Sequence, residues 1–324
     1  MTSGREQAAP IHDIGTRSHH TTGTRRWVAS ASRALAPLLW IGPALALIGF
    51  VVLWPVFVMF RTSFQKISPD GFILGLYGWR NFIHLFNQPD LPAIIIRTGI
   101  WVAAIVGGTM LISLGMAQLL NAHFPGRRLA RWALIAPWAA SVMMTSIIFR
   151  WALNPDNGVI NVLLNDLGFL SEFNSNAADW LGQPVSALVW MIGVGIFVSI
   201  PFTTYALLAG LQAVPHDVYE AAKIDGAGRW RTYWSITLPL LKPAFMVALL
   251  INIINDFNNF PIIWEMTRGG PGHETSTTTT FMYQLKQSQI GQSAAMSVIN
   301  FTLVVLVVAI YLKVMLGRNR DAVR

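Results

Sequence analysis

The chain has 324 residues, of which 53% are apolar and 12% are charged, whereas soluble proteins average roughly a quarter charged residues. This composition predicts a polytopic membrane protein and argues against a soluble class. In a soluble chain, the formal charge of +8 would suggest nucleic acid as a partner. In a membrane protein, we first ask how the Lys and Arg residues are distributed between the loops on the two sides of the membrane. The absence of cysteine excludes disulfides, thiolate metal sites and a cysteine nucleophile.

Residues 1–34 are polar and basic without apolar periodicity, which predicts a disordered cytoplasmic tail. This tail contains histidines, but an unstructured segment that simply includes them is the better interpretation, and no metal site is predicted. Six apolar runs follow within residues 35–318, each of about the 20 residues that cross a bilayer core. They cover residues 36–60, 98–121, 132–151, 185–211, 240–264 and 294–316. With a basic cytoplasmic tail at 319–324, the predicted fold class is all-α.

Local signals add detail to this plan. Residues 68–71 have the composition of a turn in the first long loop. The second run carries glycines that allow close helix approach, at positions 107, 108 and 115. The fourth run is predicted to break near Pro201, where freed backbone carbonyls could face a cavity instead of lipid.

The distribution of Lys and Arg predicts the orientation in the membrane. Six spans place both termini on the same side. The segments on that side, including the loop at 212–239, carry 15 Lys and Arg residues, or 16 with Lys242, against seven in the three opposite loops. Because loops rich in Lys and Arg stay on the cytoplasmic side, both termini and the loop at 212–239 are predicted to be cytoplasmic. This explains the basic charge without nucleic acid.

The loop between the fourth and fifth runs has helix signals of its own. Pro215 suits a first helical position, and Asp217 and Glu220 place negative charge in the first turns, where the helix dipole favours it. Gly226 is a typical helix terminator. Residues 215–225 are therefore predicted to form one short helix.

A second short helix is predicted for residues 229–234, where cations alternate with Trp and Tyr as they do at a membrane surface. In the first helix, Ala221 and Ala222 beside Glu220 leave a flat surface that a partner's backbone can approach. One interpretation is a docking surface, and the other is a capped helix at the surface of a cytoplasmic loop. The local sequence leaves both open.

The loop at 212–239 also carries a spaced signature. Its seven positions, with gaps of three, nine and one residues, are Glu220, Ala221, Ala222, Gly226, Ile236, Leu238 and Pro239. This pattern resembles the EAA loop of permease subunits in binding-protein-dependent ABC importers. The resemblance covers about residues 35–318 and implies a six-helix permease domain. It further implies that the loop is a pair of coupling helices seated in a cleft of a separate ATPase subunit.

The resemblance assigns roles and partners. Glu220 faces basic groups of the ATPase, Gly226 makes the turn, and the expected coupling residues are Glu220, Ala221, Ala222, Asp225 and Gly226. The implied partners are a second permease subunit, two ATPase subunits that bind ATP and Mg, and an extracytoplasmic solute-binding protein. The chain itself has no Gly-Lys pair and hence no Walker A phosphate loop. It is expected to bind no cofactor and to be a non-catalytic subunit.

The fifth run carries a polar cluster that consists of Asn252, Asn255, Asp256, Asn258 and Asn259. Positions 252, 255, 256 and 259 share one helix face. Exposing Asp256 to lipid would cost on the order of 3 kcal/mol, so this face is predicted to line the transport path. Amides donate and accept hydrogen bonds, which suits a substrate with many hydroxyl groups. The alternative is that these side chains hold helices or subunits together, at about 0.6–2 kcal/mol each.

The region after the polar cluster is similar to one branch of the permease family. The run 257–260, the segment 267–271, Tyr283 and Gly291 resemble the MalF-like branch, which imports sugars, oligosaccharides and glycerol phosphates. The large extracytoplasmic insertion of the best-known maltose subunit is absent, and Met266 stands where Leu is more usual. The resemblance implies a sugar or oligosaccharide as the substrate, delivered by the external binding protein and driven by ATP hydrolysis in the partner subunits.

Alternatives remain at this point. The nearly uncharged path favours a neutral polyol, although Arg97 or Arg150 near the outer face could meet a phosphate. A secondary transporter or channel could use Asp256 as an ion or proton relay, but it predicts inverted repeats with corresponding breaks, and only the break near Pro201 is visible. A membrane enzyme would need convergent catalytic side chains, and the six runs contain no histidine.

Overall fold

The computed structural model describes residues 23–168 and 179–321. The chain divides between Val58 and Met59 into two compact units, which we describe separately. Helix α1 spans Gly23–Ser63, so residues 23–34 are helical, whereas the sequence predicted disorder there. The physical reason is that residues 24–36 contain neither Gly nor Pro and are rich in helix-forming Ala and Arg. The rest of the predicted tail, residues 1–22, lies outside the described residues.

Five described segments are long and apolar enough to cross a membrane, or six if a bent pair counts as one span. The segments are Trp40–Ser63, Leu91–Asn121, Pro184–Gln212, Arg229–Met266 and Ile290–Met315. The second begins seven residues before its predicted start at 98, because Pro92 opens helix α3 (Leu91–Asn121) in its first turn. The last lies in α13 (Ile290–Asp321), which extends beyond the predicted start of the tail at 319.

The fourth span is one unbroken helix, α7 (Pro184–Gln212), and the predicted break near Pro201 is wrong. Two hydroxyl groups satisfy backbone carbonyls just before the proline. Thr203 Oγ1 donates to Ser199 O (2.9 Å), and Ser113 Oγ of α3 donates to Ile200 O (3.3 Å). These bonds do not replace the one that Pro201 cannot donate to Phe197 O, so the helix continues with that single backbone bond missing.

The third predicted span is bent instead of straight. It consists of α4 (Arg127–Ile135), a 3-10 turn (Ala136–Ala139) and α5 (Val142–Ala152), and the two arms meet at 91°. Ala140 is extended, and Ser141 then caps α5 by accepting a hydrogen bond from Met144 N (3.2 Å). Pro137 lies in the short turn and, lacking an N–H, favours the end of α4.

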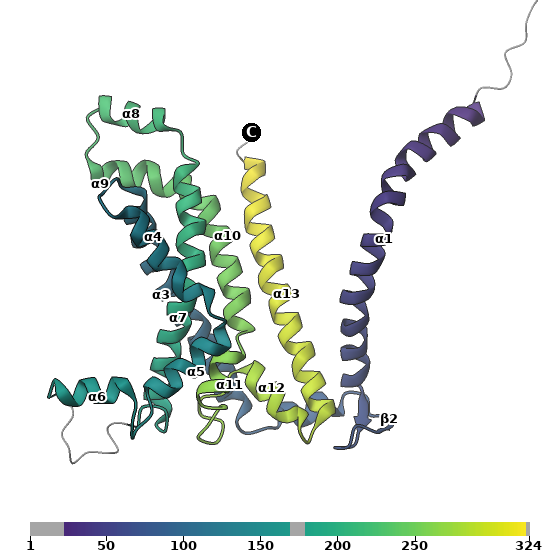
Figure 1. Cartoon of the computed structure of the whole chain (residues 1–324). Coiled ribbons are helices and arrows are strands. Elements are labelled where there is room, and N and C mark those ends of the chain that lie inside the picture. Colours follow the sequence, from purple (N-terminus) through teal and green to yellow (C-terminus); the bar gives the residue numbers. More distant parts are fainter. Residues whose placement is uncertain (1–22, 169–178, 322–324) are drawn as a thin grey trace, which may run out of the picture. The chain divides into compact units, whose positions relative to one another are not determined.

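The remaining elements lie outside the spans (Figure 1). Strands β1 (Gln65–Ile67) and β2 (Ile73–Leu76) form an antiparallel hairpin that the all-α prediction missed. The predicted turn at 68–71 is confirmed, because Gly71 N donates to Ser68 O (3.0 Å). Three short helices, α2 (Arg80–Phe86), α6 (Val159–Asp166) and α12 (Thr278–Lys286), lie at the same end of the second unit as the hairpin. Helical content otherwise confirms the predicted class.

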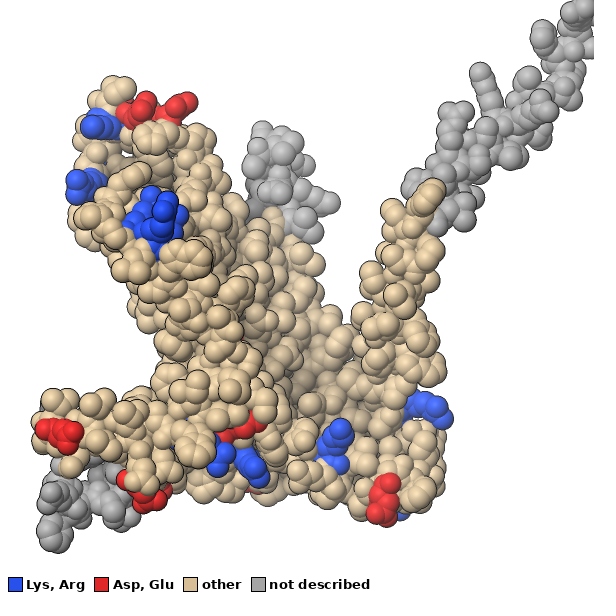
Figure 2. Space-filling model, viewed as in Figure 1, with Lys and Arg blue, Asp and Glu red and all other residues tan. Residues whose placement is uncertain are grey.

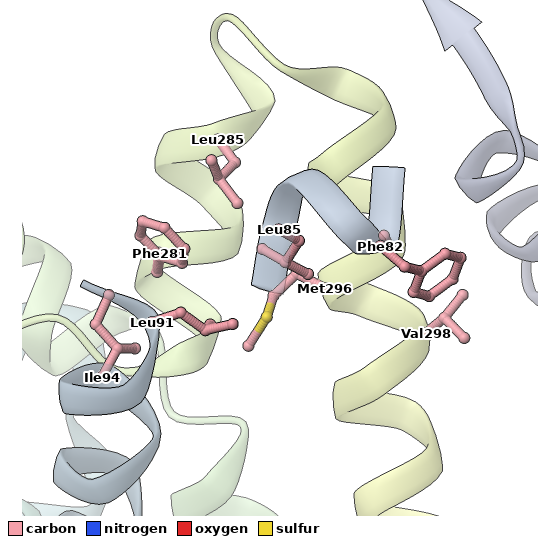
Figure 3. Close-up of a cluster of buried hydrophobic side chains, with 9 residues drawn as sticks. Phe82, Leu85, Leu91, Ile94, Phe281, Leu285, Met296 and Val298 are labelled. Carbon is pink, nitrogen blue, oxygen red and sulfur yellow. The ribbon is translucent and has the colours of Figure 1, made fainter. Parts of the chain in front are cut away.

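Hydrophobic clusters join the helices of the second unit. One cluster links α2, α3, α12 and α13 near the hairpin end, with Leu85, Ile94 and Met296 fully buried (Figure 3). Helices α3 and α7 approach closely at two glycines. A Cβ on Gly108 would lie 2.5 Å from Ile196 Cδ1, and a Cβ on Gly195 would lie 2.5 Å from Ile105 Cδ1. Of the three glycines predicted to allow close approach, only Gly108 does so within the described residues; 107 and 115 face open space.

Gly210 offers a test of the packing between α7 and α10 (Leu238–Phe257). A Cβ at this position would lie 2.5 Å from Ala244 Cβ and 2.9 Å from Leu241 Cδ1. Gly210→Ala is therefore expected to lower the stability of the purified chain in detergent by roughly 1–3 kcal/mol. Gly193→Ala, on the same helix with nothing within 4 Å, is the control and should be neutral. Equal thermal stability of the two variants would contradict this packing.

Candidate functional site

An exposed helix carries the predicted coupling residues. Helix α8 spans His216–Ile224, which confirms the first predicted helix within a residue at each end. Glu220 is 68% exposed and its Oε1 lies 3.4 Å from His216 Nδ1. Ala221 and Asp225 are exposed as well, whereas Ala222 is buried. Glu220 thus presents an exposed carboxylate next to Ala221, whose side chain is only a methyl group.

Gly226 ends α8 in a defined geometry. Its φ of +73° is left-handed backbone that glycine adopts without strain. Gly226 N donates to Lys223 O (3.1 Å) and Ala227 N donates to Ala222 O (2.9 Å). These two bonds are the Schellman arrangement, which satisfies the last carbonyls of a helix. The turn predicted at Gly226 is therefore a rigid, hydrogen-bonded cap.

The second predicted short helix is not a separate element. Helix α9 (Arg229–Thr232) continues through a π-helical turn (Tyr233–Thr237) into α10. The prediction for 229–234 was correct about helix but wrong about its independence, because the π-helical turn joins α9 to α10 without a break before Pro239. The segment Arg229–Met266 is therefore a single candidate span.

Charged side chains are distributed unevenly along the second unit. Helix α8, the start of α4 and the end of α13 lie at one end, opposite the hairpin end (Figure 1). On the face drawn in Figure 2, charged side chains gather at both ends, and the band between them is free of Lys, Arg, Asp and Glu. This is the distribution expected where an apolar band crosses a membrane.

A polar cavity lies where α10 ends. Its volume is about 590 Å³, within the range of roughly 300–1,000 Å³ typical of small-molecule sites. All members of the predicted polar cluster line it: Asn252, Asn255, Asp256, Asn258 and Asn259. The other lining residues include Trp138 of the 3-10 turn, Ser199 and Phe202 of α7, and Pro261 of α11 (Pro261–Met266). The structure thus brings the whole cluster to one place.

The five polar side chains differ in their hydrogen-bond partners and in their exposure. Asn252 is buried, with Nδ2 donating to Thr203 Oγ1 of α7 (2.9 Å) and to Ala248 O (2.8 Å). Asn258 Nδ2 donates to Ile254 O (2.8 Å), and Asn255 is exposed. Asn252 therefore links α10 to α7, as the alternative interpretation of the cluster expected, while Asn255 is open to the cavity.

Asp256 and Asn259 retain unused hydrogen-bonding capacity. A side-chain hydrogen bond joins the two residues, and Asp256 is only 2% exposed. Asp256 Oδ2 and Asn259 Oδ1 nevertheless find no hydrogen-bond donor among the described residues. Both atoms are buried acceptors that the described residues leave without a donor.

The helix is interrupted after α10, and a hydrogen bond from α3 holds the backbone at this point. The helix ends at Phe257, and α11 begins at Pro261. Trp101 of α3, which is fully buried, donates its Nε1–H to Asp256 O (3.0 Å). Sequence periodicity could not identify Trp101, Trp138 or Phe202 as parts of this site, because each belongs to an apolar run far from the polar cluster.

The two arginines considered for a phosphate do not line the cavity. Arg97 Nη1 donates to the carbonyl oxygens of His273 (2.9 Å) and Ser276 (3.2 Å). Arg150 Nη1 donates to Glu265 O (3.3 Å). Among the described residues, the lining contains one carboxylate and no cation.

Comparisons with known proteins agree with this architecture. Residues 108–319 match the family described as binding-protein-dependent transport system inner membrane component. The chain belongs to this family, and it is a multi-pass inner-membrane permease subunit. This confirms the family predicted from the loop at 212–239.

Individual relatives cover nearly the whole chain. The sulfoquinovosyl glycerol transport system permease protein of Agrobacterium fabrum is 33% identical over 299 residues, covering 91% of this chain and 94% of its own length. The trehalose/maltose transport system permease protein of Thermococcus litoralis is 32% identical over 286 residues, covering 87% and 93%. A chain of a bacterial alginate ABC transporter, solved with an alginate pentasaccharide-bound periplasmic protein, has the same fold (TM-score 0.68, 21% identity, 90% and 95% covered).

Proposed function

We propose that this permease conducts a neutral sugar or oligosaccharide past the cavity at Asp256, and that an ATPase bound to α8 drives the movement. One observation carries the proposal. The segment Arg229–Met266 begins just after the Gly226 cap and reaches the cavity, so a single helical element connects α8 to the candidate path. A displacement of α8 by a partner would pass through the capped turn at Gly226 and then along this segment.

The surface of α8 supports a protein partner. Exposed Glu220 beside Ala221 offers a charge with little steric hindrance, and a cleft with basic groups would complement it. We assign this cleft to an ATPase subunit that binds ATP and Mg, with two such subunits serving this chain and a second permease. An extracytoplasmic binding protein would deliver the substrate to the opposite end.

The orientation follows from the cations. Arg127 and Arg128 of α4, Lys223 of α8 and Lys313 of α13 belong to elements whose ends lie together in Figure 1. Because loops rich in Lys and Arg stay in the cytoplasm, we assign this end to the cytoplasm. Both termini would then be cytoplasmic as well.

The chemistry of the cavity favours a neutral substrate. The name of one relative specifies a sulfonated glycoside and that of the other neutral disaccharides, so relatedness alone does not choose between them. A cavity whose described lining contains no cation offers an anionic substrate no counter-charge. Its unpartnered acceptors, Asp256 Oδ2 and Asn259 Oδ1, instead suit the hydroxyl donors of a sugar.

Transport by the reconstituted complex tests this function. Proteoliposomes that contain both permeases and the ATPase, with the binding protein outside, should take up labelled trehalose or maltose only when ATP and Mg are inside. Uptake should persist when an ionophore abolishes the proton gradient. Uptake that follows the proton gradient without ATP would instead support the relay at Asp256, and preferential uptake of glycerol 3-phosphate, measured in parallel, would contradict the neutral substrate.

A further inference from the structure

We propose that the hairpin end of this permease binds an anionic phospholipid, whose headgroup phosphate is held by Lys66 and Arg80 beside Tyr77. Three described side chains surround the ring of Tyr77, which follows β2. Lys66 Nζ of β1 lies 5.8 Å from the centre of this ring, and Arg80 Cζ of α2 lies 5.5 Å from it. The ring of His84 is stacked on that of Tyr77, and its Nε2 lies 3.3 Å from the Tyr77 hydroxyl. Two permanent cations and one titratable ring thus converge on one phenol.

Lys66 and Arg80 have no negatively charged partner among the described residues. The carboxylates closest to them in the sequence are those of Asp70 and Asp90, and neither forms an ion pair with them in the described part of the chain. Both cationic side chains are exposed. A phosphate accepts charge-assisted hydrogen bonds from an ammonium as well as from a guanidinium group. The pair therefore has the chemistry of a phosphate site.

The surface around these cations is largely apolar. All four residues of β2, Ile73–Leu76, are exposed, and Leu76 is 85% exposed. Trp79, which precedes Arg80 in the chain, is 66% exposed. Inorganic phosphate would need only the cations, whereas a phospholipid joins a phosphate to acyl chains and so matches both parts of this surface.

The position of this surface along the chain places it at the level of the lipid headgroups. Residues 64–90 connect two candidate membrane spans, Trp40–Ser63 and Leu91–Asn121. Both ends of this segment are therefore at the membrane boundary, and β1 begins two residues after the first span ends. Trp and Tyr concentrate at this boundary, and Lys and Arg place their charges there.

The elements that carry the two cations are held together by hydrogen bonds. Asn81 Nδ2 of α2 donates to Ser63 O (2.8 Å) and to Gln65 O (2.9 Å). Tyr77 N donates to Phe64 O (2.8 Å), which ties the end of β2 to the residue before β1. The hairpin and α2 are therefore arranged before a ligand arrives, and such preorganisation lowers the entropic cost of binding.

A protein is the alternative occupant of this surface. A carboxylate of the extracytoplasmic binding protein or of the second permease would also complement the two cations. The position of the hairpin favours the lipid, because the bilayer adjoins a segment that begins one residue after a span. If a protein bound there instead, removal of the cations would weaken its binding and leave lipid binding unchanged.

The experiment uses the purified complex of this chain with its partner subunits, reconstituted in phosphatidylcholine nanodiscs that contain a small fraction of photoactivatable phosphatidylglycerol. After illumination, labelled peptides are identified and quantified by mass spectrometry. We expect labelling within residues 64–90 that excess phosphatidylglycerol displaces and inorganic phosphate does not. A photoactivatable phosphatidylcholine should label this segment roughly tenfold less, because its headgroup carries no net charge.

Variants of the two cations test the site itself. Lys66→Gln combined with Arg80→Gln is expected to reduce labelling of residues 64–90 roughly tenfold, because both charge-assisted contacts to the phosphate are lost. Lys66→Gln alone should give an intermediate loss, which provides a second test if the double variant is unstable, and Lys66→Arg should retain labelling. Lys286→Gln is the matched control. Lys286 is an exposed lysine in the last turn of α12, at the same end of the second unit, and its loss should leave this labelling unchanged.

Four results would overturn the proposal. Equal labelling of residues 64–90 by the two lipid probes, or an equal effect of Lys66→Gln and Lys286→Gln, would show that no headgroup site exists there. Displacement of the probe by inorganic phosphate would assign the site to the free anion. Weaker affinity of the double variant for the binding protein, with lipid labelling unchanged, would assign the surface to that protein. Because no sugar enters the measurement, each of these results would leave the proposed function untouched.

Discussion

Glu220→Lys is expected to abolish substrate-stimulated ATP hydrolysis by the reconstituted complex, while the chain still inserts into the membrane. Glu220 is an exposed carboxylate of α8, and reversal of its charge would place a cation against the basic groups that we assign to the ATPase cleft. Removing one partner of a buried charge pair at an interface costs about 2–5 kcal/mol, and reversal adds repulsion. Stimulated hydrolysis should therefore fall at least tenfold, towards the basal rate of the ATPase.

Asp217→Lys is the matched control for this variant. Asp217 is exposed on the same helix and undergoes the same change in charge. Its loss from the first turn should cost only about 0.3–1 kcal/mol through the helix dipole, with coupling largely retained. Normal coupling in Glu220→Lys, or equal loss in both variants, would refute a specific role for Glu220.

Asp256→Asn is expected to reduce sugar uptake at least tenfold without lowering the stability of the complex. The substitution keeps the size of the side chain but replaces one carboxyl oxygen with an amide N–H donor, so a substrate hydroxyl that donates to Asp256 loses its acceptor. In the absence of substrate, Asp256 Oδ2 has no hydrogen-bond donor among the described residues, and a buried unpaired charge is itself destabilising. Its removal should leave thermal stability unchanged or raise it.

Asn252→Ala should behave in the opposite way. Its amide bonds Thr203 and Ala248 O, so its loss should destabilise the complex by about 0.6–2 kcal/mol, with uptake per assembled complex preserved. Uptake and thermal unfolding are measured on both variants. If Asp256→Asn also lost stability while the assembled complexes transported normally, Asp256 would hold helices together and would not belong to the path.

The sequence was sufficient where a single residue determines local structure. Gly226 predicted the end of α8, and the structure shows its positive φ and both cap bonds. The composition of residues 68–71 predicted the turn that the hairpin uses. Apolar length and charge distribution predicted the helical membrane class, because the cost of burying backbone or charge in lipid acts on every residue of a span.

The errors arose where a distant residue decides the outcome. Pro201 does not break α7, which packs closely against α3, a distant segment of the chain. Helix periodicity placed positions 252, 255, 256 and 259 on one face, yet Asn259 lies beyond the end of the helix and lines the cavity from the break. Asn252 found its partner in Thr203, 49 residues away. A pattern within one run contains no information about such neighbours.

The π-helical turn at Tyr233–Thr237 determines an angle as well as a connection. A π turn contains one more residue than the α-helical turn it replaces, and each residue of an α-helix rotates the chain by about 100°. The extra residue therefore rotates α9 about the helix axis relative to the side of α10 that faces the cavity. The rotation also fixes the direction in which the chain leaves α9 towards α8. If α8 binds the ATPase as we propose, a shift of one residue in this turn would present a different side of α8 to that partner.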